Sequence, residues 1–224
     1  MIESATGLIL RTRPLTETSL IVHWLTPNLG RLATVAKGAR RPKSPFRGKL
    51  DLFYLADFSF NRSRCSELHA LREVSLRETY PLLRQELACL QQVCYCAALV
   101  EQATEIEATI PGVFDVMSGM LKLVVQSPKS KIQSPTSDAH SKAIGIFAFE
   151  LKLVRELGLA PDLDKTRLSA GSRQIVKALT NNEWPMLARI QLSKAQRLEL
   201  QQFLHGFLIF HLGRIPKGRS AALG

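Results

Sequence analysis

The sequence lacks the features that mark several common classes of protein. No apolar run approaches the roughly 18 residues that a membrane-spanning helix needs. The N-terminus, MIES, has neither the basic segment nor the apolar core of a secretory signal. We therefore expect a cytoplasmic protein with no membrane partner.

Catalytic and metal-binding motifs are also missing. G-x-S-x-G, H-E-x-x-H and C-x-x-C do not occur, and Lys43 and Leu50 stand where a P-loop needs Gly and Ser or Thr. Cys94 and Cys96 lie two positions apart on an expected helix and face different sides, so they cannot chelate one ion. The carboxylates Glu101, Glu105 and Glu107 are expected on an exposed helix face. We therefore expect no metal, no cofactor and no enzymatic activity. An enzyme that acts on nucleic acid is kept as a third hypothesis, behind the two described below.

Acidic residues are few relative to basic ones. Nineteen Asp and Glu oppose 30 Lys and Arg, which gives a net charge of +11. Such an excess attracts polyanions, either nucleic acid or anionic membranes. The 224 residues, 46% of them hydrophobic, are enough for one large domain or two small ones.

Short strands dominate the first 78 residues, and we expect them at 7–13, 18–25, 31–37, 50–60 and 67–74. In the fourth, Leu50, Leu52, Tyr54, Ala56, Phe58 and Phe60 share one parity, which is the pattern of a half-buried strand. Five closely spaced strands, the first three with no helix between them, predict a small barrel.

Helical periodicity begins after Pro81. Apolar residues at steps of three and four predict helices at 82–108, 113–125 and 141–157, short helices at 172–179 and 184–190, and a last helix capped by Ser193. A Ser-, Pro- and Lys-rich stretch at 126–138 is expected to be a flexible loop, and the tail from Gly213 is expected to be a basic loop. The predicted fold class is α+β, with an all-β domain at 1–78 and an all-α domain at 79–224.

One segment, residues 31–49, combines many cations with no acid. Gly38, Pro42, Pro45 and Gly48 prevent it from being a helix, so its charges lie on a strand end and a long loop. Cations on a loop release counterions from phosphates, which predicts nucleic-acid binding with a salt slope of about −0.7 per contact on single strands. The alternative is a solvated surface that only aids solubility. The cations are Arg31, Lys37, Arg40, Arg41, Lys43, Arg47 and Lys49.

Phe46 lies in the middle of this run and has two interpretations. An aromatic ring in a basic loop can stack on a base, as can Phe53 or Tyr54 nearby. It can equally be a hydrophobic plug that packs under the loop. We include Phe46 among the candidate nucleic-acid-binding residues and keep both interpretations open.

Four stretches resemble the N-terminal signature of bacterial RecO DNA-repair proteins in residue type, order and spacing. They are GLILRTRPLTETSLIV at 7–22, LTPNLGRL at 25–32, VAKGARRPKS at 35–44 and FRGKL at 46–50. FELKLVRELGLAPDLD at 149–164 and the residues His211, Pro216 and Arg219 resemble the family's central helix and C-terminal end.

The resemblance implies an OB-fold barrel followed by a helical bundle, and a nucleoid-associated role in recombination. It implies binding to single- and double-stranded DNA, annealing of complementary strands coated with single-strand-binding protein (SSB), and cooperation with RecR to load RecA. The acidic tail of SSB would dock on the helical domain, where Lys142, Lys152 and Arg155 are the candidate basic residues. The alternative is a generic OB-fold module for single-stranded DNA or RNA without mediator activity.

One departure from the family concerns zinc. Many RecO proteins carry four cysteines directly after the APDLD turn, whereas residues 165–173 here read KTRLSAGSR. We therefore expect this chain to lack the zinc site and to carry a shortened loop or small helix in its place.

Overall fold

The computed structural model describes residues 2–126 and 135–224 and divides into two compact units. The barrel unit contains Met1–Pro81 and Thr104–Phe114, and the helical unit contains Leu82–Ala103 and Asp115–Gly224. The sequence pattern places everything after residue 78 in the helical domain. Residues 104–114 instead belong to the barrel unit, although they lie between two helices in the sequence.

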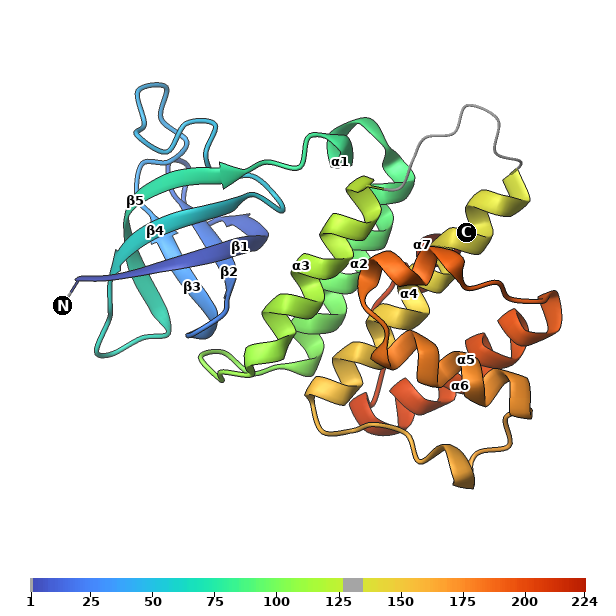
Figure 1. The fold of residues 1–224 in the computed structure, drawn as a ribbon. Coiled ribbons are helices and arrows are strands. Elements are labelled where there is room, and N and C mark those ends of the chain that lie inside the picture. Colours follow the sequence, from blue (N-terminus) through green and yellow to red (C-terminus); the bar gives the residue numbers. More distant parts are fainter. Residues whose placement is uncertain (1, 127–134) are drawn as a thin grey trace. The chain divides into compact units, whose positions relative to one another are not determined.

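The barrel unit contains five strands, β1 (Ile2–Pro14), β2 (Leu20–Thr26), β3 (Gly30–Ala36), β4 (Leu55–Asn61) and β5 (Leu68–Glu78). They close in the order β1-β2-β3-β5-β4, with β4 returning to β1. All neighbours are antiparallel except β3 and β5, which pair in parallel (Figure 1). This is the order of an OB-fold barrel, and it confirms the predicted fold class.

Aromatic side chains fill the barrel because alternate residues of each strand point inward. Trp24 of β2 stacks on Phe58 of β4 with ring centroids 4.1 Å apart. The Trp24 indole Nε1–H is also satisfied, donating to Thr34 Oγ1 at 2.8 Å. Ring packing and a satisfied polar group together give this core a single arrangement.

The fourth strand is shorter than its sequence parity predicts. Residues 51–54 form a turn, in which the buried Phe53 has a φ of 62°. Its N–H donates to Ile9 O at 2.8 Å, and Ile9 N–H donates to Tyr54 O at 3.0 Å. These bonds to β1 hold Phe53 in the left-handed region, so β4 begins only at Leu55.

The helical unit is built from the remaining elements of the chain. The helix predicted at 82–108 is in fact two helices, the second of which ends at Ala103. The C-terminal tail contains a further short helix. Residues 135–138, predicted as loop, belong to a helix. The rest of that loop lies outside the described residues. The elements are α1 (Leu82–Gln85), α2 (Leu87–Ala103), α3 (Pro111–Gln126), α4 (Pro135–Glu156), η1 (Leu163–Lys165), α5 (Ala170–Asn181), η2 (Trp184–Arg189), α6 (Lys194–Leu212) and α7 (Arg219–Leu223).

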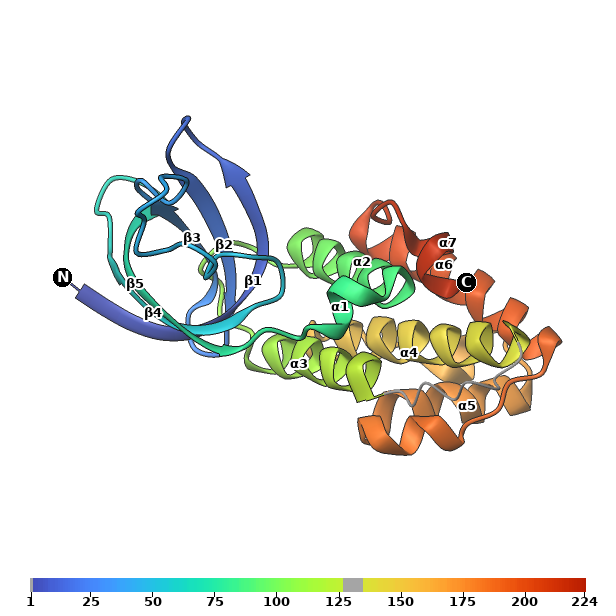
Figure 2. The same cartoon turned by 90° about the horizontal axis from the view of Figure 1, so that it is seen from above.

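Helix α4 runs through the middle of the helical unit and contacts α2, α5, α6 and α7 (Figure 2). Even its Glu150 is fully buried, and this carboxylate accepts two bonds from Arg219 of α7, at 2.6 and 2.8 Å. Tyr95 Oη of α2 donates to the same carboxylate at 2.5 Å. The tail was predicted to be a loop, but pairing with a buried charge fixes Arg219 in place.

Two helix ends follow the sequence closely. Ser193 caps α6 and forms a capping box with Gln196, which confirms the predicted start. Gly158, with a φ of 73°, follows α4 as predicted.

The described residues contain neither a candidate membrane-spanning helix nor a candidate metal-binding cluster. None of their helices is long and apolar enough to cross a membrane, and no group of three His, Cys, Asp or Glu among them is placed to hold a metal.

We predict that Gly119→Ala destabilises the helical unit. A Cβ atom on Gly119 of α3 would overlap Nε1 of Trp184, and overpacking of this kind costs about 1–3 kcal/mol. Gly206→Ala in α6 is the matched control, since a Cβ atom there meets nothing within 4 Å. Replacing a glycine inside a helix by alanine also stabilises the helix by about 0.5–1 kcal/mol. Thermal melting should place Gly119→Ala below wild type and Gly206→Ala at or above it. Equal melting of the two variants contradicts the packing argument.

Candidate nucleic-acid interface

The basic loop, residues 37–49, leads from β3 towards β4 as a series of tight turns. Gly38 and Gly48 supply backbone with φ of 69° and 72°, a conformation that favours glycine. Each turn is closed by an N–H that donates to the carbonyl three residues earlier. The donors are Ala39, Arg41, Ser44, Arg47 and Lys49, and the distances are 3.0–3.4 Å.

Two anchors hold the basic loop against the barrel. Arg40 N–H donates to Thr18 O at 2.9 Å, which ties the loop to the turn between β1 and β2. Phe46 is 6% exposed and belongs to the same core cluster as Trp24 and Phe58. The structure therefore corrects the assignment of Phe46 as a base platform, because the ring is a hydrophobic plug.

The cations of the basic loop face solvent. Within the described part of the chain none of them forms an ion pair. Arg40 and Arg47 each donate to a backbone carbonyl at 3.3 Å, which leaves the positive charge uncancelled. Lys37, Arg40, Arg41, Lys43 and Arg47 are exposed, and Lys49 is half-buried.

Arg31 does not belong to this surface. It lies near the start of β3, at the opposite end of the strand from Lys37. Its Nε donates to Thr104 Oγ1 at 2.8 Å, and its Nη2 bonds the Thr104 carbonyl. Its guanidinium binds a segment of the barrel unit, which sets Arg31 apart from the other cations of residues 31–49.

That segment, Thr104–Thr109, we call the crossing segment. Glu107 N–H donates to Arg31 O at 2.7 Å, and Thr109 Oγ1 donates to Asn28 O at 3.2 Å. The Glu107 carboxylate pairs with Arg62 at 2.8 Å and with the buried His69 at 2.5 Å. Glu107 was expected on a helix face, but its φ is 58°. No local signal in the sequence identifies these partners, which lie far along the chain.

Two cavities adjoin the basic loop. The first, which we call the loop pocket, has a volume of about 510 Å³. Of the described residues that line it, Asp51 alone is acidic, whereas Arg40, Arg41 and Arg47 are basic. The lining residues are Leu20, Ala39, Arg40, Arg41, Pro42, Phe46, Arg47, Gly48, Leu50, Asp51 and Tyr54.

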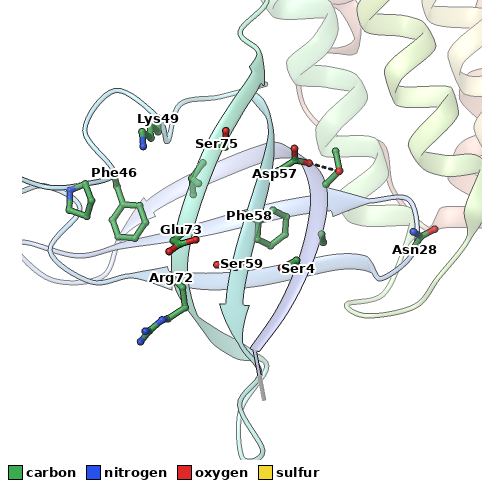
Figure 3. A pocket seen from close by; sticks show the side chains of 14 residues that line it. Ser4, Asn28, Phe46, Lys49, Asp57, Phe58, Ser59, Arg72, Glu73 and Ser75 are labelled. Atoms are coloured by element: carbon green, nitrogen blue, oxygen red, sulfur yellow. Dashed lines mark hydrogen bonds between the residues drawn. The ribbon is translucent and has the colours of Figure 1, made fainter.

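The second cavity, the strand groove, has a volume of about 790 Å³ and runs over β1, β4 and β5. Figure 3 shows Lys49 and Arg72 beside it, together with the acids Asp57 and Glu73. A hydrogen bond from Thr6 at 2.6 Å and the neighbouring Arg77 lower the pKa of Asp57, so this acid is ionised at neutral pH. The mixed charges make the groove a poorer phosphate site than the basic loop.

Comparisons with known proteins agree with this geometry. A family model described as Recombination protein O N terminal matches residues 1–80. A DNA repair protein RecO of Exiguobacterium sibiricum is 29% identical over 84% of this chain and 70% of its own length. One from Alkaliphilus metalliredigens is 30% identical over 73% of this chain and 61% of its own length. One from Pelotomaculum thermopropionicum is 27% identical over 94% of this chain and 89% of its own length.

The chain belongs to the RecO family. Membership supports a role in DNA repair and recombination. The match spans less than two thirds of the Alkaliphilus RecO protein, so activities of whole RecO proteins come to this chain only as proposals.

The residues chosen for an SSB tail in the RecO helical domain are placed differently from expectation. Lys152 is 6% exposed, and its Nζ donates to the carbonyls of Thr180 and Asn182 at 3.0 and 2.7 Å. Burial and the neighbouring Arg155 lower the Lys152 pKa. Arg155 donates to Thr180 O at 2.9 Å, so both cations serve the C-terminal end of α5. Lys142 lies on α4 ten residues before Lys152, roughly 15 Å away along the helix axis. It therefore lies apart from Lys152 and Arg155.

We predict that Arg31→Ala loosens the crossing segment and leaves DNA affinity unchanged. Loss of the guanidinium removes both bonds to Thr104, so hydrogen exchange at the Glu107 amide should accelerate. Arg47→Ala is the matched control and should show the reverse, with weaker DNA binding and unchanged exchange at Glu107. The assignment of Arg31 is wrong if its variant weakens DNA binding as much as Arg47→Ala does.

Proposed function

We propose that this protein is a non-enzymatic recombination mediator that acts on DNA at the nucleoid, in the cytoplasm. In this role it binds single- and double-stranded DNA, anneals complementary strands coated with SSB and, with RecR, helps to load RecA. Membership of the RecO family supports the biological role. The observation that carries the DNA-binding part is the basic loop, a series of backbone turns that carries six cations on an OB-fold barrel.

The physical basis of this proposal is electrostatic. Phosphates attract the loop cations and release counterions, so affinity falls steeply as salt rises. Contacts to phosphates carry no base information, which suits a protein that must act on any broken or gapped sequence. The turns already order the backbone of the loop, so less conformational entropy is lost on binding.

The loop assignment predicts the behaviour of Arg40→Glu/Arg41→Glu. Affinity for single-stranded DNA should fall on the order of tenfold or more. The slope of log affinity against log salt should flatten by about 1.4, which is two contacts at about 0.7 each. Fluorescence anisotropy over a salt series measures both quantities.

A control variant separates the position of the charges from their sum. Arg64→Glu/Arg72→Glu changes the net charge equally, and both arginines are exposed and lie outside the basic loop. This variant should keep most of the affinity. If the two double variants lose affinity equally, net charge and not the basic loop governs binding.

The mediator role predicts a dependence on SSB. Complementary oligonucleotides coated with the cognate SSB should anneal faster when this protein is added, and removal of the acidic SSB tail should abolish the acceleration. The labelled strands should be recovered at full length after incubation with magnesium, as expected of a non-enzymatic protein. Absence of any acceleration would sink the mediator proposal.

The same assay tests the alternative, a generic OB-fold module for single-stranded DNA or RNA. Such a module binds strands through the barrel alone and is indifferent to the SSB tail. Lys152, one of the side chains proposed for that tail, is only 6% exposed, which favours the alternative. The tail truncation is therefore the decisive arm of the experiment.

A further inference from the structure

The loop pocket combines an apolar floor with a cationic rim. Its volume of about 510 Å³ lies within the range of roughly 300–1,000 Å³ that small-ligand sites occupy. Every wall belongs to the barrel unit, and the turns and anchors of the basic loop hold the outer wall in place.

The floor is formed by apolar residues at the end of the barrel. Leu20 and Leu50 are half-buried and pack against the barrel core. Two aromatic residues also line the pocket, but Phe46 is only 6% exposed. Tyr54 also packs against the barrel core, but it is half-buried and therefore more accessible than Phe46. Tyr54 is therefore the residue that can offer a flat apolar contact to a ligand.

The rim carries the charge. Arg40, Arg41 and Arg47 are exposed and line the same pocket. A guanidinium binds phosphate oxygens through a planar fork of N–H donors. A group that satisfies both parts of the site must have a flat apolar portion and an anionic portion a short distance away, and a nucleotide is such a group.

We propose that the loop pocket holds one unpaired nucleobase, which stacks on Tyr54 while Arg40, Arg41 and Arg47 bind the flanking phosphates. This inference rests on the DNA-binding function proposed above and extends it from phosphates to a base. The contact is tolerant of sequence, because every base has a flat π-face.

The strand groove is less suited than the loop pocket to hold a nucleotide and its phosphates. Its acids Asp57 and Glu73 offset the cations Lys49 and Arg72, so its lining carries no excess of positive charge for phosphates. In the loop pocket three arginines face the single acid Asp51. The balance of charge therefore selects the loop pocket.

A base pocket distinguishes single strands from duplexes. A paired base lies inside its stack and must be flipped out before it can enter a pocket, at a cost in unstacking and unpairing. The pocket therefore adds affinity for single strands only. A base that leaves the pocket to pair with its complement gives up this contact, so annealing weakens the hold on the product.

The test compares a strand of about 16 nucleotides, the upper site size of one OB fold, with the same strand carrying abasic sites. Both probes have the same phosphates, so only base contacts differ. Wild-type protein should bind the base-bearing strand roughly 5- to 150-fold more tightly, since stacking contributes that much per base. Equal affinity for the two strands overturns the pocket, whatever the variants show.

Variants then place the contact at Tyr54. Tyr54→Leu keeps an apolar lining but removes the ring, and it should reduce the difference between the two strands. Tyr54→Phe keeps the ring and should retain the difference. The pocket is also wrong if Tyr54→Leu melts like wild type and discriminates between the two strands equally well.

A second readout needs no variant. A 2-aminopurine base placed in the strand should lose fluorescence on binding, because stacking quenches it. Unchanged fluorescence argues against the pocket.

The controls separate this inference from the proposed function. If only the base pocket is wrong, both strands bind equally, yet Arg40→Glu/Arg41→Glu still weakens both. If DNA binding by the basic loop is wrong, that double variant has no effect on either strand.

Discussion

Burial of Phe46 is the constraint on which the candidate interface depends. Six cations within residues 37–49 repel one another and favour an expanded loop. Against this, the Phe46 ring is 6% exposed within the barrel core, and burial of such a side chain contributes about 1.5–3 kcal/mol. One apolar residue thus pins the middle of the loop, and the bond from Arg40 N–H to Thr18 O pins its start. Because these two anchors hold the loop backbone against the barrel, the six cations remain close together.

Local patterns predicted the elements whose causes are local. Alternating apolar residues marked the strands of the barrel, and Ser193 with Gln196 marked the start of α6. The prediction was wrong where distant bonds decide the outcome. Residues 50–54 continue the parity of β4, yet Phe53 turns because its N–H reaches Ile9 O, far earlier in the chain. Arg219 closes a buried ion pair with Glu150 across 69 positions, and a basic tail gives no sign of it.

The dependence on distant contacts also explains why the sequence did not show which individual cations have partners. The acid-free run indicated a basic loop, but a count of charges does not show which of them have partners. Arg31 binds Thr104, and Lys152 binds carbonyls at the C-terminal end of α5, only in the folded chain. The role of Glu107 was missed for the same reason, since its partner His69 comes from a strand that lies 38 positions away.

The net charge of +11 is therefore a poor guide to the interface until the partners are known. Arg77 and Arg219 form ion pairs with carboxylates, and each such pair cancels its own charge. The cations of the basic loop form none within the described residues. Bonds from Arg40 and Arg47 to backbone carbonyls position these side chains but leave their charge available. The fold thus uses Arg77 and Arg219 for internal contacts, whereas one buried ring holds the loop whose six cations can meet an anionic partner.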